Sequence, residues 1–91
     1  MSLRIGFVGF RHAHIHDLYR KATETDGVEV VAACEEDETT RADAVARGVR
    51  ITHRLADDLL GDGNCDVIAI GDYYSRRGAL AQQALSAGKH V

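Results

Sequence analysis

The chain has 91 residues, of which 45 % are hydrophobic and 27 % are charged, and its formal net charge at pH 7 is −3. This length allows one small domain, and the lack of a basic excess argues against a nucleic-acid-binding surface. No apolar run approaches the roughly 18 residues of a membrane-spanning helix. The apolar segment after Arg4 contains two glycines and is typical of a strand rather than a signal peptide.

The two cysteines, Cys34 and Cys65, lie in or beside apolar segments. Buried reduced thiols are the expected state there, rather than a disulfide or a metal-binding pair. Together with the composition, this predicts a cytoplasmic protein with neither a nucleic-acid nor a membrane partner.

The first third of the chain predicts a strand, a helix and a second strand. Residues 5–10 are a short apolar segment that is typical of a strand. Residues 14–25 follow with apolar side chains at helical spacing. We expect the inward face of this helix to consist of Ile15, Leu18, Tyr19 and Ala22. Asp26 and Gly27 end the helix, and residues 28–34 form a valine-rich second strand.

The next segment predicts a second helix. Thr39 or Thr40 is a suitable N-cap for a helix that runs to Arg47 and ends at Gly48. Its inward face is expected to consist of Ala42, Val45 and Ala46.

The rest of the chain predicts two strands, two helices and the beginning of another strand. Residues 49–52 and 66–70 are the strands, and the second lacks alternation, as expected of a strand covered on both faces. Residues 55–60 and 76–87 are the helices. Their inward side chains are expected to be Leu59 and Leu60, and Leu80, Ala81, Ala84 and Leu85. An apolar segment begins near His90 and is cut off, which predicts a fragment of a longer protein.

Strand and helix alternate about four times along the chain. This pattern predicts an α/β fold, a doubly wound parallel sheet with helices on both faces and right-handed connections. No linker interrupts the pattern, so residues 1–91 are expected to form one domain. Such sheets bind ligands at the carboxyl ends of their strands beside the first strand, which directs attention to residues 7–16.

This segment partly matches the dinucleotide-binding fingerprint, in which three glycines precede a helix whose N-terminus binds pyrophosphate. Gly9 occupies the first glycine position, whereas Arg11 and His14 occupy the second and third. The expected cofactor contacts of this loop are Gly9, Phe10, Arg11 and His12. The Arg11 side chain either narrows the approach of the pyrophosphate or holds it through its guanidinium, and the sequence leaves both readings open.

Glu35 follows the second strand, about 21 residues after His14. An acid at this position can accept hydrogen bonds from the adenosine ribose of a dinucleotide. The four consecutive acids at residues 35–38 would repel a 2′-phosphate, so NAD is expected in preference to NADP. The alternative is a solvated acidic loop without a ligand.

Three alternating histidines, His12, His14 and His16, lie at the start of the first predicted helix. They are candidates for contact with cofactor or substrate, for a structural role, or for a metal, since His12 and His16 would share a helix face. No other histidine or cysteine pair has the spacing of a metal site, so no metal is expected.

Several segments together resemble the amino-terminal domain of the glucose–fructose oxidoreductase, inositol dehydrogenase and rhizopine-catabolism family of dehydrogenases. The similar segments are residues 3–10, 28–35, 57–60, 65–70 and 84–91, and the last of these is the most specific. The resemblance implies a Rossmann domain with strand order 3-2-1-4-5, whose fifth strand is truncated here. It also implies a following substrate domain, absent from this chain, that usually forms the oligomer interface.

The family oxidises or reduces sugars, cyclitols and related polyols with NAD or NADP, which implies a small-molecule substrate. Its catalytic lysine would lie just past Val91, so no catalytic residue is expected within this chain. In the family the loop after the fourth strand packs along the nicotinamide, which makes Gly71, Asp72 and Tyr73 candidate cofactor contacts. Tyr73 stands where the family usually has proline, and Arg77 stands in place of its histidine.

Two main functions are therefore open. The first is the NAD(P)-binding domain of an oxidoreductase that acts on a sugar, cyclitol or related polyol. The second is a Rossmann-like module that has lost dinucleotide binding and acts in regulation or scaffolding. The features that favour the second are Arg11, His14, Tyr73 and Arg77. A doubly wound domain for another ligand, such as a mononucleotide, is a third alternative, because fold alone does not decide function.

Overall fold

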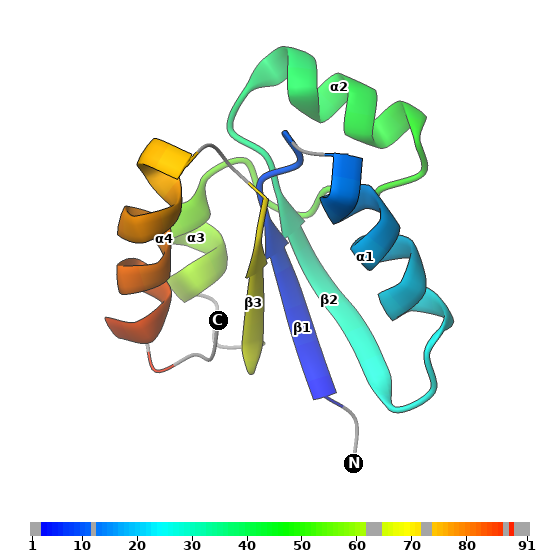
Figure 1. The fold of residues 1–91 in the computed structure, drawn as a ribbon, viewed down its shortest axis with the longest axis horizontal. Helices are drawn as coiled ribbons and strands as arrows, with labels where there is room; N and C mark the ends of the chain where they lie inside the picture. Colours follow the sequence, from blue (N-terminus) through cyan, green and yellow to red (C-terminus); the bar gives the residue numbers. More distant parts are fainter. Residues whose placement is uncertain (1–2, 12, 62–64, 72–73, 87, 89–91) are drawn as a thin grey trace.

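The computed structural model describes residues 3–11, 13–61, 65–71, 74–86 and 88. The elements, in chain order, are β1 (Leu3–Val8), α1 (Ala13–Glu24), β2 (Val28–Cys34), α2 (Glu38–Ala46), α3 (Ala56–Gly61), β3 (Val67–Ile70) and α4 (Tyr74–Ser86). Figure 1 shows α1 and α2 on one side of the sheet and α3 and α4 on the other. The doubly wound α/β fold predicted from the sequence is thus confirmed.

The described sheet has three parallel strands in the order β2-β1-β3. β1 lies in the centre and pairs Val8 with Cys34 on one side and with Ile70 on the other. The carboxyl ends of all three strands therefore meet at one edge of the sheet, which is the edge where α1 begins. The expected fifth strand near His90 lies outside the described residues.

The predicted third strand at residues 49–52 is wrong as a strand. The end of this segment contacts the outer side of β2, where the N–H groups of Thr52 and of the following His53 both donate to the carbonyl oxygen of Ala33. The one bridge formed is parallel and joins Cys34 to His53. The backbone N–H of Ala33 donates to the Thr52 side-chain oxygen Oγ1 at 2.9 Å, so a hydroxyl occupies the place of a backbone carbonyl. The segment nevertheless lies beside β2, on the side away from β1, where the predicted order 3-2-1-4 places the third strand. The fourth predicted strand of that order is β3.

The N-cap of α2 is Asp37 rather than Thr39 or Thr40. The Asp37 carboxylate accepts hydrogen bonds from the backbone N–H and the hydroxyl of Thr40, at 2.9 and 2.7 Å. An aspartate in this position satisfies backbone donors of the first turn that lack helical partners. The helix therefore begins earlier than the threonines suggested.

The inward face predicted for α2 is also wrong. Ala44 is buried, whereas Ala42 and Ala46 are exposed and Val45 is 54 % exposed. The helix contacts the core through the small Ala44 side chain, and the neighbouring apolar residues do not form the contact face.

The other helices follow the predicted faces more closely. Ile15 and Ala22 of α1 are buried, as are the leucines of α3 and Leu80 and Ala84 of α4. The exceptions are Leu18 of α1 and Leu85 of α4, which are 46 % and 61 % exposed. Helical spacing fixes which side chains share a face, but the width of the buried stripe depends on what packs against it. Among the described residues, no helix is both long and apolar enough to cross a membrane.

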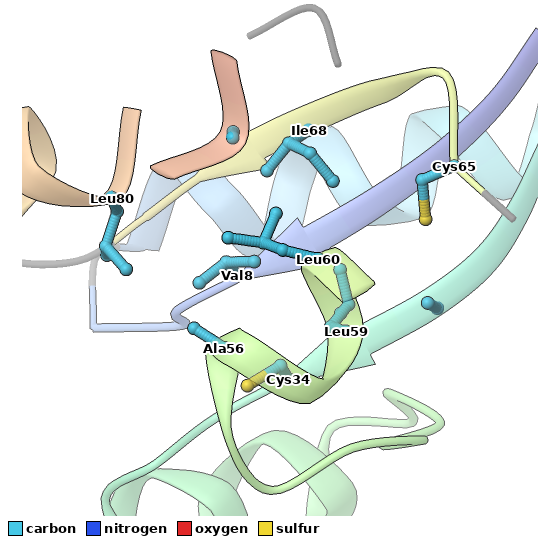
Figure 2. Close-up of a cluster of buried hydrophobic side chains, with 10 residues drawn as sticks. Val8, Cys34, Ala56, Leu59, Leu60, Cys65, Ile68 and Leu80 are labelled. Atoms are coloured by element: carbon cyan, nitrogen blue, oxygen red, sulfur yellow. The ribbon is translucent and has the colours of Figure 1, made fainter. Parts of the chain in front are cut away.

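Two hydrophobic clusters cover the two faces of the sheet. The α3 and α4 side contains both cysteine side chains together with Leu59, Ile68 and Leu80 (Figure 2). The α1 and α2 side is built around Phe7, whose ring meets that of Tyr19 edge-on at a centroid distance of 5.2 Å. Both cysteines are buried, as expected.

Candidate functional site

The turn between β1 and α1 lies at the carboxyl edge of the sheet and carries the first glycine of the fingerprint. β1 ends at Val8, Gly9 has a φ of +89°, and α1 begins at Ala13. A φ in this region is readily adopted only by glycine. The N-terminus of α1, with its partial positive charge, thus follows directly after a sharp turn, as in pyrophosphate-binding loops.

Gly71 fixes this turn from the end of β3. Its N–H donates to the carbonyl oxygen of Val8 at 2.9 Å, and its carbonyl oxygen accepts from the N–H of Arg11 at 3.0 Å. A Cβ atom at Gly71 would lie 2.7 Å from the Gly9 carbonyl oxygen and 2.7 Å from the Ile15 Cβ. Residue 71 must therefore be glycine for the turn, β3 and α1 to approach this closely.

This arrangement explains how α1 packs closely without the third fingerprint glycine. That glycine normally allows close contact between helix and strand, but His14 occupies the position and is exposed. The close approach here depends on Gly71, which directly follows the neighbouring strand β3. Sequence reasoning selected Gly71 only through its place in the loop after the fourth strand, and the packing requirement becomes visible in three dimensions.

Glu35 lies beside the same turn, but its carboxylate faces the protein interior. The residue is 1 % exposed. Oε1 accepts a hydrogen bond from the backbone N–H of Phe10, and Oε2 accepts one from the backbone N–H of Asp37, both at 2.8 Å. The expected role of Glu35 as acceptor for the ribose hydroxyls stays a prediction, and in this conformation protein donors occupy both oxygens.

The Phe10 side chain is part of the core rather than of the site surface. It is 3 % exposed and contacts the rings of Phe7, His16 and Tyr19. The part of Phe10 that belongs to the site is therefore its backbone, through the N–H that Glu35 accepts.

Arg11, at the second glycine position, is half-buried. Hydrogen bonds from Thr40 hold the pKa of Asp37 below its usual value of 3.8, and the positive charges of Arg11 and Arg41 act in the same direction. The Arg11 side chain thus places a cation near the turn that follows β2.

An open pocket of about 510 Å³, with mostly charged lining residues, lies next to this turn. Its lining residues are Glu36, Glu38, Arg41, Arg54, Leu55 and Asp58. The Arg41 side chain is fixed there because Nη1 donates to the carbonyl oxygen of Glu35 at 3.0 Å. Sequence reasoning missed both arginines, and the only available signal was their position shortly after predicted strands.

Some candidate residues cannot be placed. His12, Asp72 and Tyr73 lie outside the described residues, and α4 is described at Arg77 only as backbone. Within the described part of the chain, no group of three histidine, cysteine or acidic side chains is arranged to hold a metal ion.

A scan against protein-family models and a search of curated proteins find no match for this sequence. Solved structures do match. Biliverdin reductase from Synechocystis, in complex with biliverdin and NADP+, is 28 % identical with a TM-score of 0.82, over all of this chain and 28 % of that one. An NAD-binding oxidoreductase from Klebsiella pneumoniae is 25 % identical with a TM-score of 0.75, over all of this chain and 26 % of that one.

A third match is scyllo-inositol dehydrogenase from Lactobacillus casei, with bound NAD(H) and scyllo-inositol. It is 23 % identical with a TM-score of 0.78, over all of this chain and 27 % of that one. The matches confirm, at the level of the fold, the resemblance to the amino-terminal Rossmann domain of these oxidoreductases. The chain spans about a quarter of the length of the matched proteins.

Proposed function

We propose that this chain is the nicotinamide-dinucleotide-binding domain of an oxidoreductase. The observation that carries the proposal is the turn at Gly9, with its φ of +89° between β1 and the N-terminus of α1, at the carboxyl edge of a parallel sheet. The matched oxidoreductases support it, since they share this fold and are described with NAD(H) or NADP+.

The pyrophosphate half of a dinucleotide fits the described residues better than the ribose half. The N-terminus of α1 offers backbone donors and a partial positive charge, and Arg11 adds a nearby cation. The ribose position is less clearly formed, because the Glu35 carboxylate is buried and hydrogen-bonded to Phe10 and Asp37.

When bound, the cofactor would supply hydride transfer, and the residues of this chain would hold and orient it. We propose NAD in preference to NADP because, of the acids at residues 35–38, the three that follow the buried Glu35 are exposed or partly exposed and would repel a 2′-phosphate. The catalytic residues and the substrate-binding surface are proposed to lie in a further domain of a longer protein, which also forms any homo-oligomer interface.

A sugar, cyclitol or related polyol is the proposed substrate class. The match to an inositol dehydrogenase is in line with it, but the match to a biliverdin reductase shows that the same fold accompanies a very different substrate. A cytoplasmic location belongs to the same proposal and rests on composition and cysteine usage.

Calorimetric titration of the intact protein with NAD and, separately, with NADP tests this function. We expect saturable binding of at least one of them with a micromolar Kd, and weaker binding by Gly9→Val, which cannot readily adopt the left-handed turn. Gly48→Val is the matched control, because Gly48 also has a positive φ but lies at the end of α2. A folded protein that binds neither nucleotide would contradict the proposal.

One observation favours the alternative of a Rossmann-like module without a dinucleotide. The N–H groups of Phe10 and Arg11, next to Gly9, are both taken by protein acceptors, Glu35 and Gly71. A loop whose amides are satisfied internally has less to offer a phosphate. Under this alternative the domain would act in regulation or scaffolding, and neither titration would show heat of binding.

A further inference from the structure

Among the residues whose side chains the structure describes, Glu35 is the one buried polar residue. Removing a carboxylate from water is unfavourable unless hydrogen bonds compensate. Here two backbone N–H groups do so, from Phe10 and Asp37, at the short distances typical of charge-assisted hydrogen bonds.

The two donors belong to separate parts of the site. Phe10 lies in the turn after β1, which is the proposed phosphate-binding turn, and Asp37 is the N-cap of α2. The Gly9 N–H donates in addition to the carbonyl oxygen of Cys34, the residue before Glu35. The end of β2 therefore holds the phosphate-binding turn through one backbone contact and one side-chain contact.

We propose that Glu35 is a positioning residue, which orients the turn at Gly9 and Phe10, and that it does not select between NAD and NADP by contacting the ribose. This inference rests on the proposed function. A ribose hydroxyl reaches the carboxylate only if the covering residues move, because Glu35 is 1 % exposed.

The two roles predict different binding constants. A ribose acceptor favours NAD and disfavours the 2′-phosphate of NADP, so its loss changes the ratio of the two affinities. A positioning residue acts on the pyrophosphate turn, which is common to both nucleotides, so its loss weakens both equally.

The test is calorimetry of the intact protein with NAD and NADP, at a temperature well below the unfolding transition of each variant. Glu35→Gln is expected to lower both affinities by the same factor, about tenfold, as for one lost hydrogen bond, with their ratio unchanged. Glu29→Gln removes the same charge from an exposed residue of the same strand and is expected to bind like the native protein. A selective loss of NAD binding in Glu35→Gln would overturn the proposal.

Hydrogen exchange of the Phe10 and Asp37 amides gives a second readout that needs no nucleotide. Glu35→Gln keeps one acceptor oxygen, so at least one of the two amides is expected to exchange faster. Both amides are expected to exchange faster in Glu35→Asp, which keeps the charge but shortens the side chain by one methylene. Unchanged exchange in a folded variant would refute the positioning role. If the native protein binds neither nucleotide, the proposed function fails, and amide exchange still decides the role of Glu35.

Discussion

At the scale of single residues, one turn depends on two glycines, Gly9 and Gly71, which directly follow the neighbouring strands β1 and β3. Gly9 supplies the positive φ that the turn requires, and Gly71 supplies the space that lets β3 and α1 close against it. The fingerprint pattern predicted Gly9 because the requirement for a positive φ arises within the turn itself. The requirement for a residue without a side chain at position 71 comes from atoms of Gly9 and Ile15, about 60 positions away in the sequence. No local sequence pattern encodes this requirement.

Gly71→Ala should therefore destabilise the protein. The added methyl group would meet the Gly9 carbonyl oxygen and the Ile15 side chain at 2.7 Å, and overpacking of this kind costs about 1–3 kcal/mol. Urea denaturation measures the free energy of unfolding. Gly78→Ala is the matched control, because a Cβ there meets nothing within 4 Å and alanine in a helix interior stabilises by about 0.5–1 kcal/mol. Equal effects of the two substitutions would show that the close contact at Gly71 is not formed.

The cap of α2 should give stability a dependence on pH. Hydrogen bonds from Thr40 lower the pKa of Asp37 from its usual 3.8, so the carboxylate stabilises the fold above that value. The contribution is lost as pH falls through the lower pKa of the folded protein. Asp37→Ala should be less stable than the native protein at pH 7, with the difference shrinking below about pH 4. Thermal unfolding at several pH values checks this, and a constant difference would contradict it.

At the scale of elements, the sequence predicted the order and type of every described helix and of three strands, but not which apolar side chains are buried. Helical spacing places Leu80 and Leu85 at the two margins of one predicted apolar stripe on α4, yet they are 3 % and 61 % exposed. The difference arises from what packs on the helix, which a single-chain pattern does not contain. Likewise, the acid after β2 was predicted as a ligand-binding side chain, whereas its burial depends on donors from a distant turn.

Leu80 and Leu85 offer a direct comparison on one helix. Leu80→Ala should lower the free energy of unfolding by about 2–5 kcal/mol, since it leaves a cavity in the cluster of α3, α4 and the sheet. Leu85→Ala should change it by less than about 0.5 kcal/mol. Chemical denaturation of both variants provides the measurement. If Leu85→Ala were the more destabilising of the two, the described orientation of α4 would be wrong.

At the scale of the whole molecule, the described sheet is open on one side. An apolar groove of about 460 Å³ runs beside β3, lined by residues that include Ile5, Leu18 and Val67. β3 is an edge strand of the described sheet, and such apolar edges are normally covered. The predicted fifth strand, in the order 3-2-1-4-5, would lie on this side and remains a prediction. The open groove is in keeping with the proposal that the chain is one domain of a longer protein.

The central claim is that a nicotinamide dinucleotide binds at the carboxyl edge of the sheet, and hydrogen–deuterium exchange tests it most directly. The intact protein would be compared with and without saturating NAD, and likewise with NADP. We predict slower exchange in the segments 9–17 and 34–41, which contain the turn, the start of α1 and the end of β2, with segment 26–31 at the opposite edge unchanged. Exchange that is unaltered at the first two segments, or slowed only elsewhere, would contradict the claim.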